Sequence, residues 1–191
     1  MNLPNKLTLM RILLVPFFML FLYWEIPYHF TIALIIFAAA SITDALDGKI
    51  ARKYNLITTF GKFADPLADK ILVLAAFACL ADVTRDNHII NGVVVTIIAA
   101  REFMVSGLRL VTAEKGVVVA AGIWGKLKTA FTMVTIVLIL ICLAGFSDFH
   151  ALPLTPVSAM ILSVLVWISV LLTIISGGIY LKGYAKYIDM K

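Results

Sequence analysis

Long runs of uncharged, mostly apolar residues alternate with short polar segments along most of the sequence. A helix needs about 20 such residues to cross the hydrocarbon core of a bilayer. When each run is extended to the nearest helix breaker or polar cluster, the pattern predicts six transmembrane helices, over residues 6–24, 29–53, 61–82, 88–113, 124–146 and 153–181. The connections leave no room for a second domain, and no internal repeat is apparent. We therefore expect residues 1–191 to form one all-α bundle.

The composition supports a membrane protein. Of the 191 residues, 62% are hydrophobic and 14% are charged, and the mean hydropathy is +1.04. A soluble domain has roughly 25% charged residues, and a chain this small cannot bury so much apolar surface in one core. A soluble enzyme, a disordered tail and a disulfide scaffold are excluded, and the apolar runs are too long for the strands of a membrane barrel. Cys79 and Cys142 lie inside apolar runs, so we expect both to serve as small hydrophobic residues.

The basic residues predict an orientation. With the N-terminus inside, fourteen of the 16 Lys and Arg residues fall on that side, while Arg85 falls on the other and Arg101 lies within the fourth helix. Lys and Arg concentrate in cytoplasmic loops, so both termini are expected in the cytoplasm. Trp24 to Pro27 offer no signal-peptide cleavage site, which indicates that the first helix is retained. The net charge of +5 suggests contact with anionic headgroups or substrates. Because basic residues are spread among apolar segments, nucleic acid is not an expected partner.

Four of the eleven acidic residues fall between positions 44 and 69. Asp44 and Asp47 are three residues apart, and Asp65 and Asp69 are four apart, so each pair shares a face of its helix. The loop between the helices is short, so the two pairs can face each other. Four carboxylates near a membrane interface repel one another and are costly to desolvate. Two divalent ions would cancel their charge, and oxygen ligands suit Mg2+ and Mn2+. Such paired metals support in-line displacement at phosphorus.

Other interpretations of these acids stay open. Asp65, directly before Pro66, could simply be the N-cap of a helix. A solvated helix end could be formed by Asp44, Asp47, Arg52 and Lys53. Intramembrane acids also mark the ion path of cation-coupled transporters. Such transporters usually contain internal repeats with sites near the midplane, whereas these acids cluster toward one interface. The joint pattern therefore favours the metal site.

The spacing of the acidic segment is specific. It reads Asp44-x-x-Asp47-Gly48-x-x-Ala51-Arg52, then eight residues, then Gly61-x-x-x-Asp65-x-x-x-Asp69. This motif resembles the signature of the CDP-alcohol phosphatidyltransferase family, with every fixed position matched. The flanking segments resemble the bacterial glycerophosphate branch of that family, and they are Asn2-Leu3-Pro4-Asn5-x-x-Thr8-x-x-Arg11, Arg101-Glu102-Phe103 through Ser106 and Arg109, Gly125-Lys126 and Lys128-Thr129. The resemblance covers essentially the whole chain and implies a six-helix bundle.

The resemblance implies attack of an alcohol on the β-phosphorus of CDP-diacylglycerol, with release of CMP. It implies that Asp44, Asp47 and Asp65 hold two divalent cations, Mg2+ or Mn2+, and that Asp69 contributes to this site and acts as general base. The CDP-diacylglycerol site is expected at Gly48, Ala51, Arg52 and Gly61. The two glycines could instead serve close helix packing, and Arg52 could extend to the interface. The resemblance also suggests a homodimer in the plasma membrane.

The acceptor is predicted from the basic residues that remain. An acceptor with its own phosphate, such as sn-glycerol 3-phosphate, needs several cationic partners. We expect its phosphate to bind near Arg109, Lys126, Thr8 and Arg11. Lys128 could contribute or anchor lipid headgroups, and Arg101 and Glu102 are interpreted as a structural ion pair with partners elsewhere. Cardiolipin, phosphatidylserine and inositol-phosphate synthases of the same family are the alternatives. His29, His88 and His150 are expected near the outer side, away from the metals.

Overall fold

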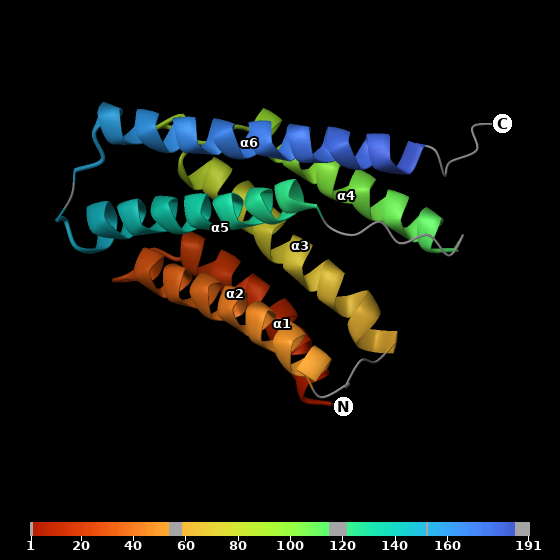
Figure 1. Cartoon of the computed structure of the whole chain (residues 1–191). Coiled ribbons are helices and arrows are strands. Elements are labelled where there is room, and N and C mark those ends of the chain that lie inside the picture. The colour runs from red at the N-terminus through yellow and green to blue at the C-terminus, as the bar shows by residue number, and fades with distance from the viewer. Residues whose placement is uncertain (1, 54–58, 115–121, 152, 186–191) are drawn as a thin grey trace.

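The computed structural model describes residues 2–53, 59–114, 122–151 and 153–185. Within these ranges it describes only the backbone of residues 3–4, 45–53, 59–60, 62–63, 65–66, 69, 113–114 and 185. The described chain is all-helical and contains α1 (Leu3–Tyr23), α2 (His29–Lys53), α3 (Thr59–Val83), α4 (Gly92–Glu114), α5 (Ile123–Leu143), a π-helical turn η1 (Ala144–Asp148) and α6 (Pro156–Ala185) (Figure 1).

The predicted helices are all present, and their ends differ from the predicted ones by at most four residues. At two helix starts the cause of the difference is visible. α4 begins at Gly92 rather than at 88, because the Asn91 side chain accepts a hydrogen bond from the Val94 amide at 3.0 Å and caps the helix. α6 begins at Pro156 rather than at 153. The Thr155 hydroxyl caps it by accepting a hydrogen bond from the Ser158 amide at 3.2 Å. The polar residue just before each helix was therefore the better boundary signal.

Asp148 at the end of η1 joins two distant parts of the chain. Its Oδ2 accepts hydrogen bonds from the amide and the hydroxyl of Thr31, both at 2.7 Å. Because Thr31 lies in the first turn of α2, the carboxylate satisfies an otherwise unpaired helix amide. This contact fixes α2 against the end of α5.

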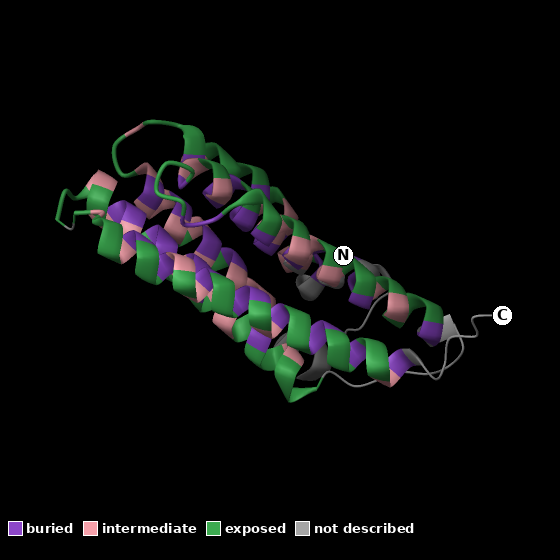
Figure 2. Cartoon of the chain, turned by 90° about the horizontal axis from the view of Figure 1, so that it is seen from above, coloured by how far each residue is buried: buried purple, intermediate pink, exposed green. Residues whose placement is uncertain are grey.

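The helices pack in two connected groups. α1, α2 and α3 contact one another, α5 packs against both α2 and α6, and α4 packs against α6 and α3. A continuous apolar core runs through the bundle and includes Phe18, Phe37, Phe77 and Ile136. Figure 2 shows the buried residues facing inward and the exposed residues facing outward. Many of those exposed residues are large and apolar, as expected for a surface that contacts lipid.

Three helical segments are long and apolar enough to cross a membrane: Asn5–Tyr23, Ile123–Asp148 and Pro156–Tyr184. A shorter apolar segment covers His29–Asp44. Within the described residues, α3 and α4 do not meet this criterion. Arg101 and Glu102 interrupt the apolar sequence of α4 near its middle. These helices support a membrane protein, whereas six full spans remain a prediction.

Helix ends that carry basic residues lie together at one end of the bundle. α1 begins and α6 ends at the right-hand end of Figure 1, where α2 ends and α3 begins. We call this the basic end, because Lys6 of α1, Lys62 of α3 and Lys182 of α6 belong to the helix ends that meet there. Arg85 and His88 lie in the turn between α3 and α4 at the opposite end. His29 and His150 also lie there, at the start of α2 and just after η1, so the three histidines lie at the end opposite the motif aspartates.

The two cysteines are free. Cys79 belongs to the apolar core, and Cys142 packs against it partly buried. This agrees with the prediction that both serve as small hydrophobic residues.

Candidate active site

The four motif aspartates lie on the two helices that meet at the basic end. Asp44 and Asp47 belong to the second half of α2, and Asp65 and Asp69 to the first half of α3. The Asp44 side chain is described and is 38% exposed. The side chains of Asp47, Asp65 and Asp69 lie outside the described part of the structure, so the facing of the two pairs stays a prediction.

The predicted donor-binding residues belong to the same two helices. Gly61 lies in the first turn of α3 and is buried. Gly48, Ala51 and Arg52 lie in α2, but their side-chain environment is outside the described part of the structure. Gly61 shares a helix face with the buried Ala64 and Ala68. Small residues therefore follow this face of α3, as close helix packing requires.

α1 presents a polar face toward this region. Asn5, Thr8 and Arg11 are all buried, and the apolar Val15 and Phe18 continue the same face along the helix. The Arg11 side chain is 0% exposed, and its Nη1 lies 2.6 Å from Oδ1 of Asp44. Breaking a buried ion pair leaves an uncompensated charge and is strongly destabilising. Arg11 therefore helps to fix the position of the first motif aspartate.

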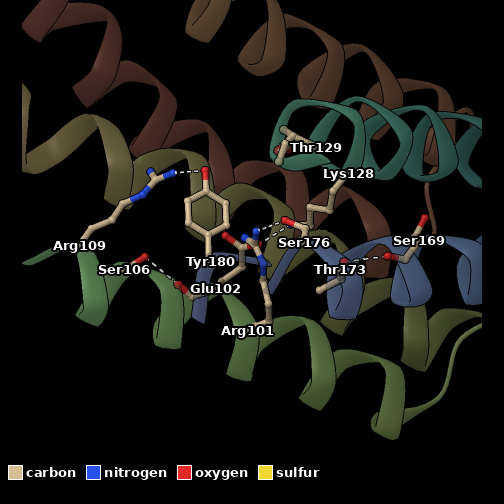
Figure 3. Close-up of polar contacts among 11 residues, drawn as sticks. Arg101, Glu102, Ser106, Arg109, Lys128, Thr129, Ser169, Thr173, Ser176 and Tyr180 are labelled. Carbon is tan, nitrogen blue, oxygen red and sulfur yellow. Dashed lines mark hydrogen bonds and ion pairs between the residues drawn. The ribbon is translucent and has the colours of Figure 1, made fainter. Parts of the chain in front are cut away.

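A second group of charged residues surrounds a cavity of about 590 Å3. Its walls come from α3, α4, α5 and α6. The lining residues are Lys70, Arg101, Glu102, Val105, Ser106, Arg109, Gly125, Lys126, Thr129, Ala130 and Tyr180. Figure 3 shows several of these side chains converging from α4, α5 and α6. Four of them are basic and one is acidic, so the lining carries a surplus of positive charge.

The structure brings together only part of the predicted acceptor set. Arg109 and Lys126 both line the cavity, although they come from different helices. Thr8 and Arg11 lie on α1 and are not among its lining residues. Arg11 instead contacts Asp44. The predicted acceptor residues therefore divide between the cavity and the aspartate region.

Tyr180 connects the cavity to α6. The Arg109 Nη2 donates a hydrogen bond to the Tyr180 hydroxyl at 2.8 Å. A Cβ at Gly125 would lie 3.3 Å from that hydroxyl oxygen. This is tighter than ordinary van der Waals contact, so the absence of a side chain at Gly125 allows Tyr180 to approach α5 closely.

A buried charge network lies beside the cavity. Glu102 accepts hydrogen bonds from Arg101, at 3.0 Å, and from Lys128, and Arg101 also donates to the Ser176 hydroxyl. The structural ion pair was therefore predicted correctly, although Arg101 and Glu102 also contact each other. The Lys128 side chain is only 5% exposed. Lys128 is thus not the headgroup anchor that we considered, because its ammonium group is paired with Glu102 from α4.

Replacing Glu102 by Gln should lower thermal stability. The side chains of Glu102 and Lys128 are 13% and 5% exposed, so the substitution leaves buried cations without their counter-charge. Breaking such a pair costs about 3–5 kcal/mol. Thermal unfolding of the purified protein in detergent checks this. Adding Lys128→Met to the variant should recover part of the loss, whereas unchanged melting of Glu102→Gln would show that the network contributes no stability.

Sequence reasoning missed two cavity residues, Tyr180 and Lys70. Tyr180 belongs to a polar stripe on α6 that also contains Ser169, Thr173 and Ser176. Intervals of four, three and four residues place these side chains on one helix face. In an otherwise apolar helix this spacing was a usable signal. Lys70 directly follows Asp69, and its place in the cavity depends on how α3 and α4 pack.

Comparison with known proteins identifies the family. A profile of the CDP-alcohol phosphatidyltransferase family matches residues 1–175. A protein of Bacillus subtilis (strain 168) is 41% identical over 191 residues, covering 94% of this chain and 93% of its own. One of Rickettsia bellii (strain RML369-C) is 39% identical over 186 residues, covering 97% of both. A third, from Pseudomonas fluorescens, is 38% identical over 143 residues, covering 73% and 72%. All three are named CDP-diacylglycerol–glycerol-3-phosphate 3-phosphatidyltransferase.

Proposed function

This chain belongs to the CDP-alcohol phosphatidyltransferase family, and we propose that it transfers the phosphatidyl group of CDP-diacylglycerol to sn-glycerol 3-phosphate, giving phosphatidylglycerophosphate and CMP. The names of the similar proteins support this reaction. The observation that carries the choice of acceptor is the cavity of about 590 Å3 with four basic and one acidic lining residue. A phosphate-bearing alcohol matches that charge better than an uncharged acceptor does.

The acceptor's phosphate would bind to Arg109 and Lys126. An arginine can donate two parallel hydrogen bonds to phosphate oxygens, and a lysine adds a compact positive charge. Both residues are exposed to solvent, so a small anion can reach them. Thr8 and Arg11 would act from α1, on the side of Asp44.

The proposed metal ligands are Asp44, Asp47, Asp65 and Asp69, for two Mg2+ or Mn2+ ions. Carboxylate oxygens are suitable donors for these ions. Asp44 also fits by its setting, because its side chain is 38% exposed and is held in place by Arg11. Among the described residues no group of three or more potential metal-binding side chains occurs, since only Asp44 of the four is described there. When bound, the ions would neutralise charge on the phosphoryl oxygens.

The chain's own residues would perform the remaining tasks. Asp69 would accept the proton of the acceptor hydroxyl. The hydroxyl oxygen would bond to the β-phosphorus as the bond between that phosphorus and the oxygen that leaves with CMP breaks. Lys70 follows Asp69 directly and lines the cavity, so the proposed acceptor site reaches the turn of α3 that carries the base. Gly48, Ala51, Arg52 and Gly61 would bind the nucleotide of the donor. Backbone approach would be closest at the glycines.

We further propose that all six helices cross the plasma membrane, with the basic end and both termini in the cytoplasm. The concentration of Lys and Arg on one side supports this orientation. The whole chain would act as one catalytic domain. It would assemble as a homodimer, as its family resemblance suggests.

Release of CMP tests the proposed function. Purified protein is supplied with CDP-diacylglycerol and, in turn, with glycerol 3-phosphate, phosphatidylglycerol, serine or inositol phosphate. We expect CMP and a new lipid product with glycerol 3-phosphate only. A preference for another alcohol would replace the proposed acceptor, and CMP release without any acceptor would indicate hydrolysis.

Cysteine labelling tests the orientation. In a background without cysteines (Cys79→Ala with Cys142→Ala), Gly122→Cys should react with a membrane-impermeant thiol reagent only after the cytoplasmic side is opened. Asn87→Cys should react from outside, because Asn87 is exposed at the end opposite the basic end. A Cβ at Gly122 meets nothing within 4 Å, so this variant should be tolerated. The reverse labelling pattern would contradict the orientation drawn from the basic residues.

A further inference from the structure

We propose that Tyr180 of α6 is a positioning residue for the acceptor's phosphate, because it holds the Arg109 guanidinium at the edge of the cavity. The inference rests on the proposed function, in which Arg109 binds that phosphate. Tyr180 acts through Arg109 rather than on the reacting atoms. It would therefore change how well the acceptor binds and leave the chemistry of phosphatidyl transfer largely unaffected.

Two contacts connect Tyr180 with Arg109. The Tyr180 hydroxyl accepts a hydrogen bond from Arg109 Nη2 at 2.8 Å. The guanidinium carbon of Arg109 also lies 5.1 Å from the centre of the tyrosine ring. The guanidinium carbon of Arg101 lies 5.6 Å from the same ring, and Figure 3 shows the ring between the two arginines. Both distances lie within the usual range of cation–π contact, about 6 Å.

Tyr180 is itself held firmly. It is 6% exposed, and its ring stacks on that of Tyr184 at 6.2 Å between centroids. On its other side Gly125 allows the hydroxyl to pack directly against α5. Arg109, in contrast, is exposed, and a long exposed side chain samples many rotamers. A fixed tyrosine restricts the rotamers of Arg109 before the ligand binds. Less side-chain conformational entropy is then lost on binding.

The chemistry of the contact suits an anionic ligand. A phenol is neutral, so it orients Arg109 without cancelling its charge, and it uses one of five guanidinium N–H donors. Arg101 differs, because its Nη1 lies 3.0 Å from Oε1 of Glu102, whose negative charge partly balances the charge of the guanidinium. Of the two arginines beside the ring, Arg109 is therefore the better partner for a phosphate.

Tyr180→Phe isolates the hydroxyl, because the ring remains. With the full-length enzyme in detergent, we expect the KM for glycerol 3-phosphate to rise about fivefold, less than for the loss of a charge-assisted hydrogen bond to the phosphate itself, because Tyr180 acts through Arg109. The KM for CDP-diacylglycerol and kcat should stay within about twofold. Tyr28→Phe is the control: it is the same change at an exposed tyrosine just before α2, at the opposite end of the bundle and outside the cavity lining, and it should leave both KM values unchanged.

A double-mutant cycle separates this inference from the proposed function. Arg109→Ala alone should raise the acceptor KM, and Tyr180→Phe should then add no further rise. If Arg109→Ala leaves the acceptor KM unchanged, the proposed acceptor site is wrong and the inference fails with it. If Arg109→Ala raises it but Tyr180→Phe has no effect, or the same effect in both backgrounds, only the role of Tyr180 is overturned.

Gly125→Ala provides a second route should Tyr180→Phe fold poorly. The added methyl group would lie 3.3 Å from the tyrosine hydroxyl, so Tyr180 would have to shift by a few tenths of an ångström away from α5, which changes its contact with Arg109. We expect the acceptor KM to rise in this variant as well, and the rise should again disappear when Arg109 is Ala. An unchanged acceptor KM in a folded Gly125→Ala enzyme that retains the native Tyr180 would overturn the inference.

Discussion

Removing divalent cations with a chelator should abolish CMP release by the purified protein, and adding Mg2+ or Mn2+ should restore it. Asp44→Asn, Asp47→Asn and Asp65→Asn should each lower activity by roughly a hundredfold or more, since even residues behind metal ligands contribute 10–100-fold. Part of the loss should be recovered at higher metal concentration, because each substitution removes a full ligand charge. A metal titration of each variant measures this.

Asp69→Asn should behave differently from the other three variants. If Asp69 accepts the acceptor's proton, its loss should mainly lower kcat, and extra metal should not restore it. Asp86→Asn is the control, because Asp86 is an exposed carboxylate at the end opposite the basic end. Full activity of Asp69→Asn at neutral pH would rule out its role as base. Undiminished activity in chelator would rule out the metal site altogether.

Asp44→Asn should also carry a cost in stability. Its carboxylate pairs with the fully buried Arg11, and an uncharged Asn in its place removes this ion pair from the guanidinium. Thermal unfolding of the variant therefore belongs beside its metal titration. Lower thermal stability reports the loss of the ion pair, and the metal titration reports the loss of the metal ligand.

The helices were predictable because their signal is local. Apolar runs and breakers placed α2 at 29–53, as observed, and placed α3 within two residues at its start. The starts of α4 and α6 were less accurate, because Asn91 and Thr155 cap those helices within segments that were assigned to the helices themselves. Capping is decided by one side chain and its backbone neighbour. A hydrophobic average over many residues does not resolve it.

The site was predictable only where the residues form a pattern along the chain. The four aspartates were found by their spacing, but the cavity depends on packing between helices that are distant in sequence. Arg109 and Tyr180 are 71 residues apart, and no periodicity connects them. Lys128 illustrates the same limit. Its position near a helix start suggested an interfacial lysine. Only the three-dimensional arrangement, in which α4 and α5 both pack against α6, shows that Glu102 pairs with it.

Arg109→Ala and Lys126→Ala should each raise the KM for glycerol 3-phosphate steeply. Both residues line the cavity, and loss of a hydrogen bond to a charged group costs roughly 1.5–3 kcal/mol, or about tenfold or more in affinity. The KM for CDP-diacylglycerol should change little, since the donor is assigned to residues of α2 and α3. Initial rates of CMP release, measured at varied acceptor and then at varied donor, separate the two effects.

Lys182→Ala is the matched control for both variants. Lys182 is an exposed lysine in the last turn of α6, at the same basic end but outside the cavity lining. If positive charge at this end acted only by attracting anions in general, all three variants would raise the acceptor KM alike, and high salt would abolish the difference. A specific phosphate site predicts a large effect at Arg109 and Lys126 alone. If those two variants instead keep the native acceptor KM and bind the lipid donor poorly, the cavity belongs to the donor, and the acceptor must bind nearer to Thr8 and Arg11.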